Sequence, residues 1–170
     1  VVTIYDQSGN GRNLTQSTAA NQPQIVASGT IYTGANGKPE CRFDGSNDRM
    51  LTGSFTFTAP TTYFLVCRQI SFTNGDRLLD GLASANKSDI QQFTTSPNII
   101  LQTDASFITL TTQTIGANGL VTCVTDTTSS SIRRNNDTAV TGTLLASAMG
   151  GITLGCAQNA TGFGNFAFQE

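Results

Sequence analysis

Hydrophobic residues in this sequence occur in short runs rich in β-branched and aromatic side chains, and no stretch keeps a 3.6-residue apolar period for three turns. Glycine, asparagine, aspartate and serine separate the runs, and four of the separators are Asn-Gly pairs, which favour tight turns. Many short strands without intervening helices predict a sandwich or a barrel. At most one helical turn is expected, at 146–149. The expected strands are 1–5, 23–27, 39–43, 49–57, 61–70, 76–82, 89–94, 98–102, 106–112, 120–126, 130–134, 138–142, 151–156 and 163–170.

Three of these segments also indicate how the strands are placed. Segment 62–67 is largely apolar on both faces, which predicts a central strand covered on both sides. In segment 120–126 both faces mix threonine with apolar residues, as in a sheet with one wetter side. Segment 131–140 runs as strand, Asn/Asp turn and strand, and therefore predicts a hairpin.

Length and charge limit the kinds of partner. The 170 residues fit a single domain, 1–170, which is large enough to fold without metal or disulfide support. Nine basic and eleven acidic side chains give a net charge of −2, which excludes the basic face of a nucleic-acid-binding domain. No run approaches the ~18 apolar residues of a membrane-spanning helix. We therefore expect neither nucleic acid nor a membrane as partner.

The four cysteines, Cys41, Cys67, Cys123 and Cys156, show no Cys-x-x-Cys spacing, and the sequence has no histidine. The usual structural zinc patterns therefore cannot form. Cys67, Cys123 and Cys156 each lie in a strand-like run, where a free cysteine serves as a small buried side chain. An even number also permits two disulfides, but we expect free thiols, with Cys67 and Cys123 buried on central strands.

The residues that catalysis would need are largely missing. Without histidine neither Ser-His nor Cys-His catalysis can be assembled, and no Gly-x-Ser-x-Gly turn is present. Glycoside hydrolysis needs two neighbouring carboxylates, and neither of the two glutamates has another acid at that spacing. Two aspartate pairs remain, Asp76 with Asp80 and Asp44 with Asp48, and the sequence around Asp44 favours a turn. We therefore expect no enzyme activity.

Two polar loops carry oxygen ligands of the kind that calcium prefers. Asp6, Ser8 and Asn10 lie in one loop and Asp44 and Asp48 in the other, without the 12-residue spacing of an EF-hand. The alternative is that the side chains only cap their own loops through Asx turns. For 6–14 we expect an ordered loop in which Asp6 and Asn10 accept backbone N–H bonds. Calcium is the one cofactor that this pattern suggests.

Glycan binding would require exposed aromatic rings, and the sequence has no tryptophan. Tyr63 lies in an apolar run and is expected in the core. Tyr32, in the polar segment 31–34, is the best candidate for a ligand-binding ring.

Several phrases resemble one family of domains. The opening TIYDQSGNGRNLTQ at 3–16, followed by ANQP at 20–23, resembles a segment of laminin-G-like, concanavalin-A-like domains. RFDGSNDRML at 42–51, the apolar strand at 62–68, the hairpin at 134–138, ITLG at 152–155 and FGNFAFQE at 163–170 resemble later landmarks of these domains in the same order. The resemblance covers nearly the whole chain. It implies an all-β, two-sheet antiparallel jelly-roll sandwich.

The resemblance also implies a setting. Such domains occur in bacterial surface proteins and in phage tail, fibre and capsid-decoration proteins. It implies a non-catalytic structural or adhesive module on the virion surface, with other virion subunits, copies of itself in a symmetric oligomer, or a cell-surface glycan as partner. The alternatives are a carbohydrate-binding module of a secreted or bacterial cell-surface protein and, third, a degenerate glycoside hydrolase domain.

The opening phrase is also similar to a stretch of the jelly-roll catalytic domain of fungal α-L-arabinofuranosidases. Those enzymes carry a Cys-Cys-Phe-Asp-Tyr-Gly-like segment with an acidic catalytic residue, and this sequence has no such segment. No catalytic role is therefore carried over.

In the family that the sequence resembles, an apolar closing strand follows the segment that corresponds to 163–170. We therefore expect the chain to be part of a longer polypeptide. Its two termini are expected at a sheet edge, completed by the continuation of the chain or by a neighbouring subunit.

Overall fold

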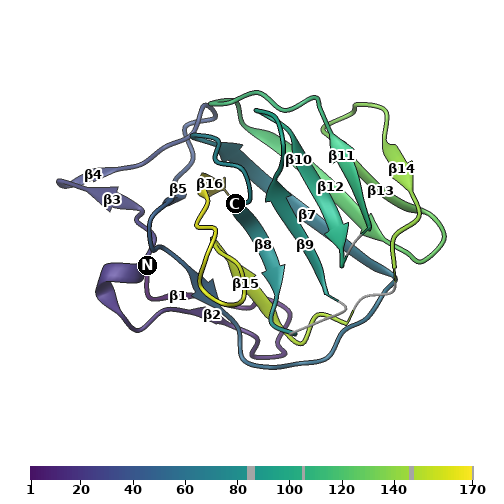
Figure 1. Cartoon of the computed structure of the whole chain (residues 1–170). Helices are drawn as coiled ribbons and strands as arrows, with labels where there is room; N and C mark the ends of the chain where they lie inside the picture. Colours follow the sequence, from purple (N-terminus) through teal and green to yellow (C-terminus); the bar gives the residue numbers. More distant parts are fainter. Residues whose placement is uncertain (84–86, 105, 146–147, 170) are drawn as a thin grey trace.

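The computed structural model describes residues 1–83, 87–104, 106–145 and 148–169. Two antiparallel sheets pack face to face, and Figure 1 looks onto the larger one, which carries β8 and β9. The expected all-β jelly-roll sandwich is confirmed. None of the described helical segments is long and apolar enough to cross a membrane.

The larger sheet has eight strands, in the order β1 (Thr3–Ile4), β2 (Leu14–Thr15), β6 (Met50–Leu51), β15 (Ile152–Leu154), β8 (Arg77–Gly81), β9 (Ser88–Gln92), β10 (Ile99–Thr103) and β11 (Ser106–Leu110). The six-stranded sheet has the order β14 (Val140–Gly142), β13 (Ser130–Arg134), β12 (Gly119–Thr125), β7 (Thr61–Gln69), β16 (Asn165–Gln169) and β5 (Glu40–Asp44). A separate ribbon joins β3 (Val26–Ala27) and β4 (Thr30–Ile31), and η1 (Ala19–Asn21) is a single 3₁₀ turn.

Aromatic side chains from β5 and β16 form one end of the core. The rings of Phe43 and Phe166 stack with centroids 4.8 Å apart, and Phe168 meets both edge-on. Inward-facing aliphatic residues of both sheets, such as Leu101 and Ile132, complete the same buried cluster. The alternation of side chains along each strand thus supplies one apolar face per sheet.

The strand predictions agree with the structure except at short or irregular segments. The strand expected at 49–57 is limited to β6, because beyond it the backbone makes only scattered bonds, such as Thr52 N to Ile152 O and Phe55 N to Gly150 O. Strands β2 and β4, of two residues each, were not predicted. The helical turn expected at 146–149 falls partly on residues outside those described.

The prediction that segment 62–67 is covered on both faces is wrong. Strand β7 is central in its sheet, yet Phe64 on its outer face is 67% exposed. Within the described residues no further layer covers the outer face of this sheet, so its apolar side chains contribute to the surface. The hairpin predicted at 131–140 is confirmed by the pairing of Ile132 with Val140.

The expectation that both termini lie at a sheet edge holds for one of them. Strand β1 is the edge of the eight-stranded sheet, whereas β16 lies between β7 and β5 and is bonded on both sides. Strand β5 forms the edge instead, because residues 40–44 pair with the last strand of the chain.

All four cysteines are free, as expected, and Cys67 and Cys123 are buried on β7 and β12. Burial raises the pKa of Cys41 and Cys156 to about 11 and that of Cys67 to about 12. The thiolate is the form that reacts with thiol reagents. These cysteines are therefore protected from such reagents both by burial and by staying protonated at neutral pH.

We therefore expect a thiol reagent such as 5,5′-dithiobis(2-nitrobenzoate) to leave the folded protein almost unmodified at neutral pH. In denaturant the same reagent should modify all four thiols. The reaction is followed by absorbance. Rapid modification of more than one thiol in the folded protein would contradict the packing described here, since only Cys41 is half-buried.

Candidate functional site

One residue from every strand of the eight-stranded sheet lies in a single transverse row. Consecutive members are register partners, so their side chains share one face of the sheet. The next pair along β8 and β9, Leu79 and Ile90, belongs to the core, so the row points away from it. The row consists of Thr3, Thr15, Leu51, Thr153, Asp80, Asp89, Gln102 and Phe107.

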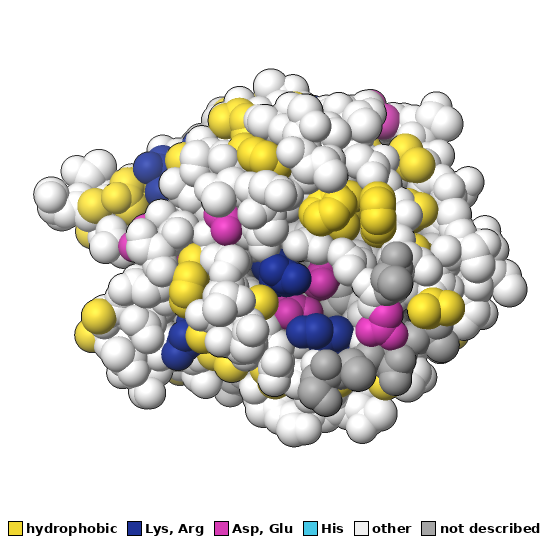
Figure 2. Space-filling model, in the orientation of Figure 1, with side chains coloured by type: hydrophobic (Ala, Val, Ile, Leu, Met, Phe, Trp, Pro, Cys, Tyr) yellow, Lys and Arg dark blue, Asp and Glu magenta, His cyan; other side chains and the backbone are white. Residues whose placement is uncertain are grey.

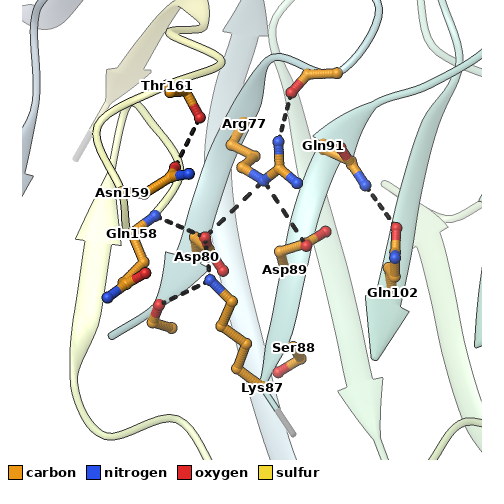
Figure 3. A network of polar contacts seen from close by, with 12 residues as sticks. Arg77, Asp80, Lys87, Ser88, Asp89, Gln91, Gln102, Gln158, Asn159 and Thr161 are labelled. Carbon is orange, nitrogen blue, oxygen red and sulfur yellow. Dashed lines mark hydrogen bonds and ion pairs between the residues drawn. The ribbon is translucent and has the colours of Figure 1, made fainter. Parts of the chain in front are cut away.

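At the centre of the row, Asp80 and Asp89 form a cluster with the neighbouring Arg77 and Lys87. We call these four residues the charged cluster. Lys87 Nζ donates to Asp80 Oδ2 over 2.7 Å, and the backbone N–H of Gln158 donates to the same oxygen over 2.9 Å. Arg77 Nε lies 3.9 Å from both Asp80 Oδ2 and Asp89 Oδ2, so it bridges the two carboxylates (Figure 3). In Figure 2 acidic and basic side chains gather in a hollow near the middle of this face.

Several polar atoms of this region are buried but make no hydrogen bond with the described residues. They are Arg77 Nε, Asp80 Oδ1, Asp89 Oδ1 and Thr153 Oγ1. Arg77 is held through Nη1, which donates to Gly75 O over 2.8 Å. A buried polar group without a partner costs roughly 1–3 kcal/mol. Each such group calls for a partner, such as a water molecule or a polar ligand.

The two carboxyl groups of the cluster have different surroundings. Burial, together with the charge of Asp80, raises the pKa of Asp89 to about 7 against the opposing effect of Arg77 and Lys87. Asp89 is therefore protonated in weakly acidic solution and can donate a hydrogen bond there. Asp80 is fully buried and carries the bonds from Lys87 and from the loop.

Amide and aromatic side chains extend the row beyond the charged cluster. Gln91 Nε2 donates to Gln102 Oε1 over 2.6 Å (Figure 3). Gln102 Nε2 in turn donates to Asp104 O. Phe107 is 49% exposed and meets Phe93 edge-on with ring centroids 5.3 Å apart. The face thus combines polar groups with an accessible apolar ring, the combination found in many small-ligand sites.

Sequence reasoning did not find this cluster. It named Asp80 in a pair with Asp76, but the structure brings Asp80 beside Asp89, its register partner on β9. The available signal was the alternation of Asp89 and Gln91 with the apolar Ile90. That pattern marks a polar face without saying which strand lies beside it.

The loop at 6–14 is ordered, but only part of the predicted bonding is present. Asp6 Oδ1 accepts the Ser8 N–H over 2.8 Å and Oδ2 accepts the Arg12 N–H over 2.9 Å, as expected. Hydrogen bonds from Ser8 and Arg12 lower the pKa of Asp6 to about 2. The prediction for Asn10 is wrong, because its side chain donates a hydrogen bond to Ser8 Oγ. Another side chain of this loop that accepts a backbone N–H bond is Asn13, whose Oδ1 accepts from Asp6 N.

Asp44 and Asp48 both cap the turn between them. Asp44 Oδ1 accepts from Ser46 N and Asn47 N, and Asp48 Oδ2 accepts from Asp44 N. Among the described residues no three acidic or cysteine side chains gather into a group that could hold a metal ion. Calcium binding by Asp6, Asn10, Asp44 and Asp48 therefore stays a prediction. The alternative, that the side chains only cap their own loops, also explains the positions of Asp6 and Asp44.

We expect a chelator to leave the melting temperature unchanged, because both Asp6 oxygens already accept loop N–H groups. The measurement is thermal unfolding with added calcium and with EDTA at matched ionic strength. A rise in melting temperature with calcium that EDTA reverses would instead establish a bound ion.

The three tyrosines lie in different surroundings. Tyr32 is half-buried and one face of its ring is covered by the Arg42 guanidinium, whose central carbon is 3.9 Å from the ring centroid. Tyr5 is the more exposed ring, at 69%. Tyr63 is in the core, as expected, and its hydroxyl shares a 3.0 Å hydrogen bond with Ser88 Oγ. Neither Tyr5 nor Tyr32 belongs to the transverse row.

Comparisons with known proteins show the fold. No family model matches the sequence, and no curated protein matches it. A solved structure of a mutant GH54 α-L-arabinofuranosidase, soaked with 4-nitrophenyl α-L-arabinofuranoside, is similar to this chain with a TM-score of 0.64 and 15% sequence identity. The match covers 98% of this chain and 45% of that one, so this chain corresponds to less than half of the enzyme's length.

Proposed function

We propose that this domain binds a glycan, without hydrolysing it, on the outer face of the eight-stranded sheet. The observation that carries the proposal is the charged cluster, where the partly exposed side chains of Arg77 and Lys87 lie beside Asp80 and Asp89, two members of the transverse row. A sugar hydroxyl donates one hydrogen bond and accepts others, so it can serve carboxylates and cationic N–H groups at the same time.

The neighbouring residues support the same ligand class. Arg77 and Lys87 are partly exposed and present N–H groups to a ligand, while Asp80 and Asp89 beneath them fix their positions. Phe107 offers an exposed ring on which the C–H groups of a sugar can pack. The solved structure of similar fold is a glycoside hydrolase soaked with an arabinofuranoside, which agrees with a sugar as ligand.

Binding without hydrolysis follows from the state of the two carboxylates. A retaining glycosidase needs one carboxylate oxygen free to attack the sugar and a second group to protonate the leaving oxygen. Here Asp80 Oδ2 is bound by Lys87 and by the Gln158 N–H, and the second oxygen of Asp80 is buried. We therefore assign the pair to ligand binding and to the positioning of Arg77 and Lys87.

The setting that we propose is the exterior of a phage particle, and a secreted or bacterial cell-surface protein is the alternative. The outer face of the six-stranded sheet supports attachment to a larger assembly. Phe64 and Leu120 are exposed there as diagonal neighbours on β7 and β12. Light scattering that shows a symmetric oligomer disrupted by Phe64→Ser would support this setting, and a monomer at all concentrations would count against it.

The binding proposal is tested first on a glycan microarray and then by calorimetric titration of the glycans that bind. Lys87→Met and Gln102→Ala are expected to weaken binding by about tenfold or more. Arg133→Gln, an exposed change on the other sheet, should leave the affinity unchanged. Absence of any glycan binding would overturn the proposal.

Hydrolysis is tested with 4-nitrophenyl α-L-arabinofuranoside and related aryl glycosides. We expect no release of 4-nitrophenol above the rate without protein. Release that is abolished by Asp80→Asn would replace the proposal with the glycoside hydrolase alternative.

A further inference from the structure

A second hollow on the same face lies in line with the charged cluster. It is a cavity of about 510 Å³ whose wall includes three members of the transverse row, Thr3, Thr15 and Leu51. Gln158 also lines it, while the backbone N–H of the same residue binds Asp80. Neighbouring strands are about 4.8 Å apart, so β6 lies roughly 10 Å from β8 across the sheet. A ligand that extends across the strands from the cluster therefore reaches this cavity.

The charge of the cavity differs from that of the cluster. Among the described lining residues Arg49 is the only charged one, and the other polar side chains there carry hydroxyl or amide groups, apart from the Cys156 thiol. The Arg49 side chain forms no hydrogen bond or ion pair with the described part of the chain, although it is half-buried. Arg49 directly precedes β6, and both Arg49 and Leu51 line the cavity.

The wall around Arg49 is fixed by its own bonds. Gln16 Nε2 donates to Arg49 O over 3.2 Å, and Gln16 Oε1 accepts from Thr18 N over 3.0 Å. A partly buried guanidinium in such a setting presents several N–H donors in one plane. A carboxylate matches this geometry with two parallel hydrogen bonds.

We infer that the cavity is a second subsite, which binds the carboxylate-bearing unit of an acidic glycan through Arg49. The inference deepens the proposed function and rests on it: a sugar at the charged cluster is followed along the row by a uronic acid. The hydroxyl and amide groups of the cavity serve the hydroxyls of that unit, and Arg49 determines the specificity.

The test compares matched sugars that differ only at one carbon. D-galacturonate is compared with D-galactose, and D-glucuronate with D-glucose, by titration followed with amide NMR. In at least one pair the uronate is expected to bind about tenfold more tightly and to shift the amide signals of 156–161. Arg49→Gln should remove this preference without changing the affinity for the neutral sugar, Arg49→Lys should restore part of it, and Arg133→Gln should have no effect.

Two outcomes distinguish a failure of this inference from a failure of the proposal that the charged cluster binds a glycan. If Lys87→Met weakens glycan binding while Arg49→Gln leaves the uronate preference intact, the subsite is wrong and the cluster stands. If the uronate binds through Arg49 but Lys87→Met has no effect, the cluster is wrong and the subsite stands. Equal affinity within both sugar pairs would overturn the inference.

Discussion

Replacing Glu40 with glutamine is expected to lower the free energy of unfolding by about 3 kcal/mol. The Glu40 side chain is fully buried, and its Oε1 accepts hydrogen bonds from Arg42 Nε over 2.6 Å and from Arg68 Nη2. Removing the negative charge leaves the guanidinium groups of Arg42 and Arg68, whose side chains are 33% and 16% exposed, without their carboxylate partner. Urea unfolding of the wild type and the variant at neutral pH measures the difference.

The matched control is Asp137→Asn in the exposed turn between β13 and β14, which changes the net charge by the same amount. It should alter stability by no more than about 0.5 kcal/mol. Adding Arg68→Met to Glu40→Gln should recover part of the loss, because one of the two uncompensated charges is then removed. A loss below 1 kcal/mol for Glu40→Gln alone would show that solvent screens the group far better than its burial indicates.

The sandwich could be predicted from the sequence because both of its determinants are local. Alternating apolar residues, as in the strand that holds Phe166 and Phe168, form the inner face of each sheet. Gly and Asn residues mark the turns, and the hairpin around Asn135–Asp137 was placed correctly. The exposure of Phe64 could not be read in this way, since it depends on whether another layer covers the sheet.

The charged cluster could not be predicted because its parts come from distant segments. Thr153 lies beside Asp80 only because β15 pairs with β8, far apart along the chain. Asp80 faces Asp89 only because the β8–β9 register shifts at an irregularity between Arg77 and Leu79. Sequence spacing carries no information on such a shift, and neither acid belongs to a recognisable motif.

The largest effect is expected for Asp89, whose contribution to stability should decrease by about 4 kcal/mol as the pH rises from 4 to 8. The ordinary pKa of aspartate is 3.8, and burial in the folded state raises the pKa of Asp89 to about 7. Between these values the folded protein binds a proton that the unfolded chain releases. The free energy of unfolding therefore falls as the pH rises through this range, and the contribution is fully present only below pH 3.8.

Asp89→Asn isolates this contribution, because asparagine keeps the shape of the side chain and does not titrate. Burial also raises the pKa of Asp48, to about 6, and that of Asp76, so the wild-type slope contains further groups that both proteins share. Asp6, with a pKa of about 2 in the folded protein, titrates below the range.

Urea unfolding at pH 4 and pH 8 measures the contribution of Asp89. The difference in the free energy of unfolding between wild type and Asp89→Asn should shift by about 4 kcal/mol between the two pH values. In Asp137→Asn, the exposed control, this difference should stay constant. Parallel curves for wild type and Asp89→Asn would mean that the Asp89 carboxyl is ionised in the folded protein, stabilised by Arg77 and Lys87, and the cluster would then offer a ligand acceptors at that position but no donor.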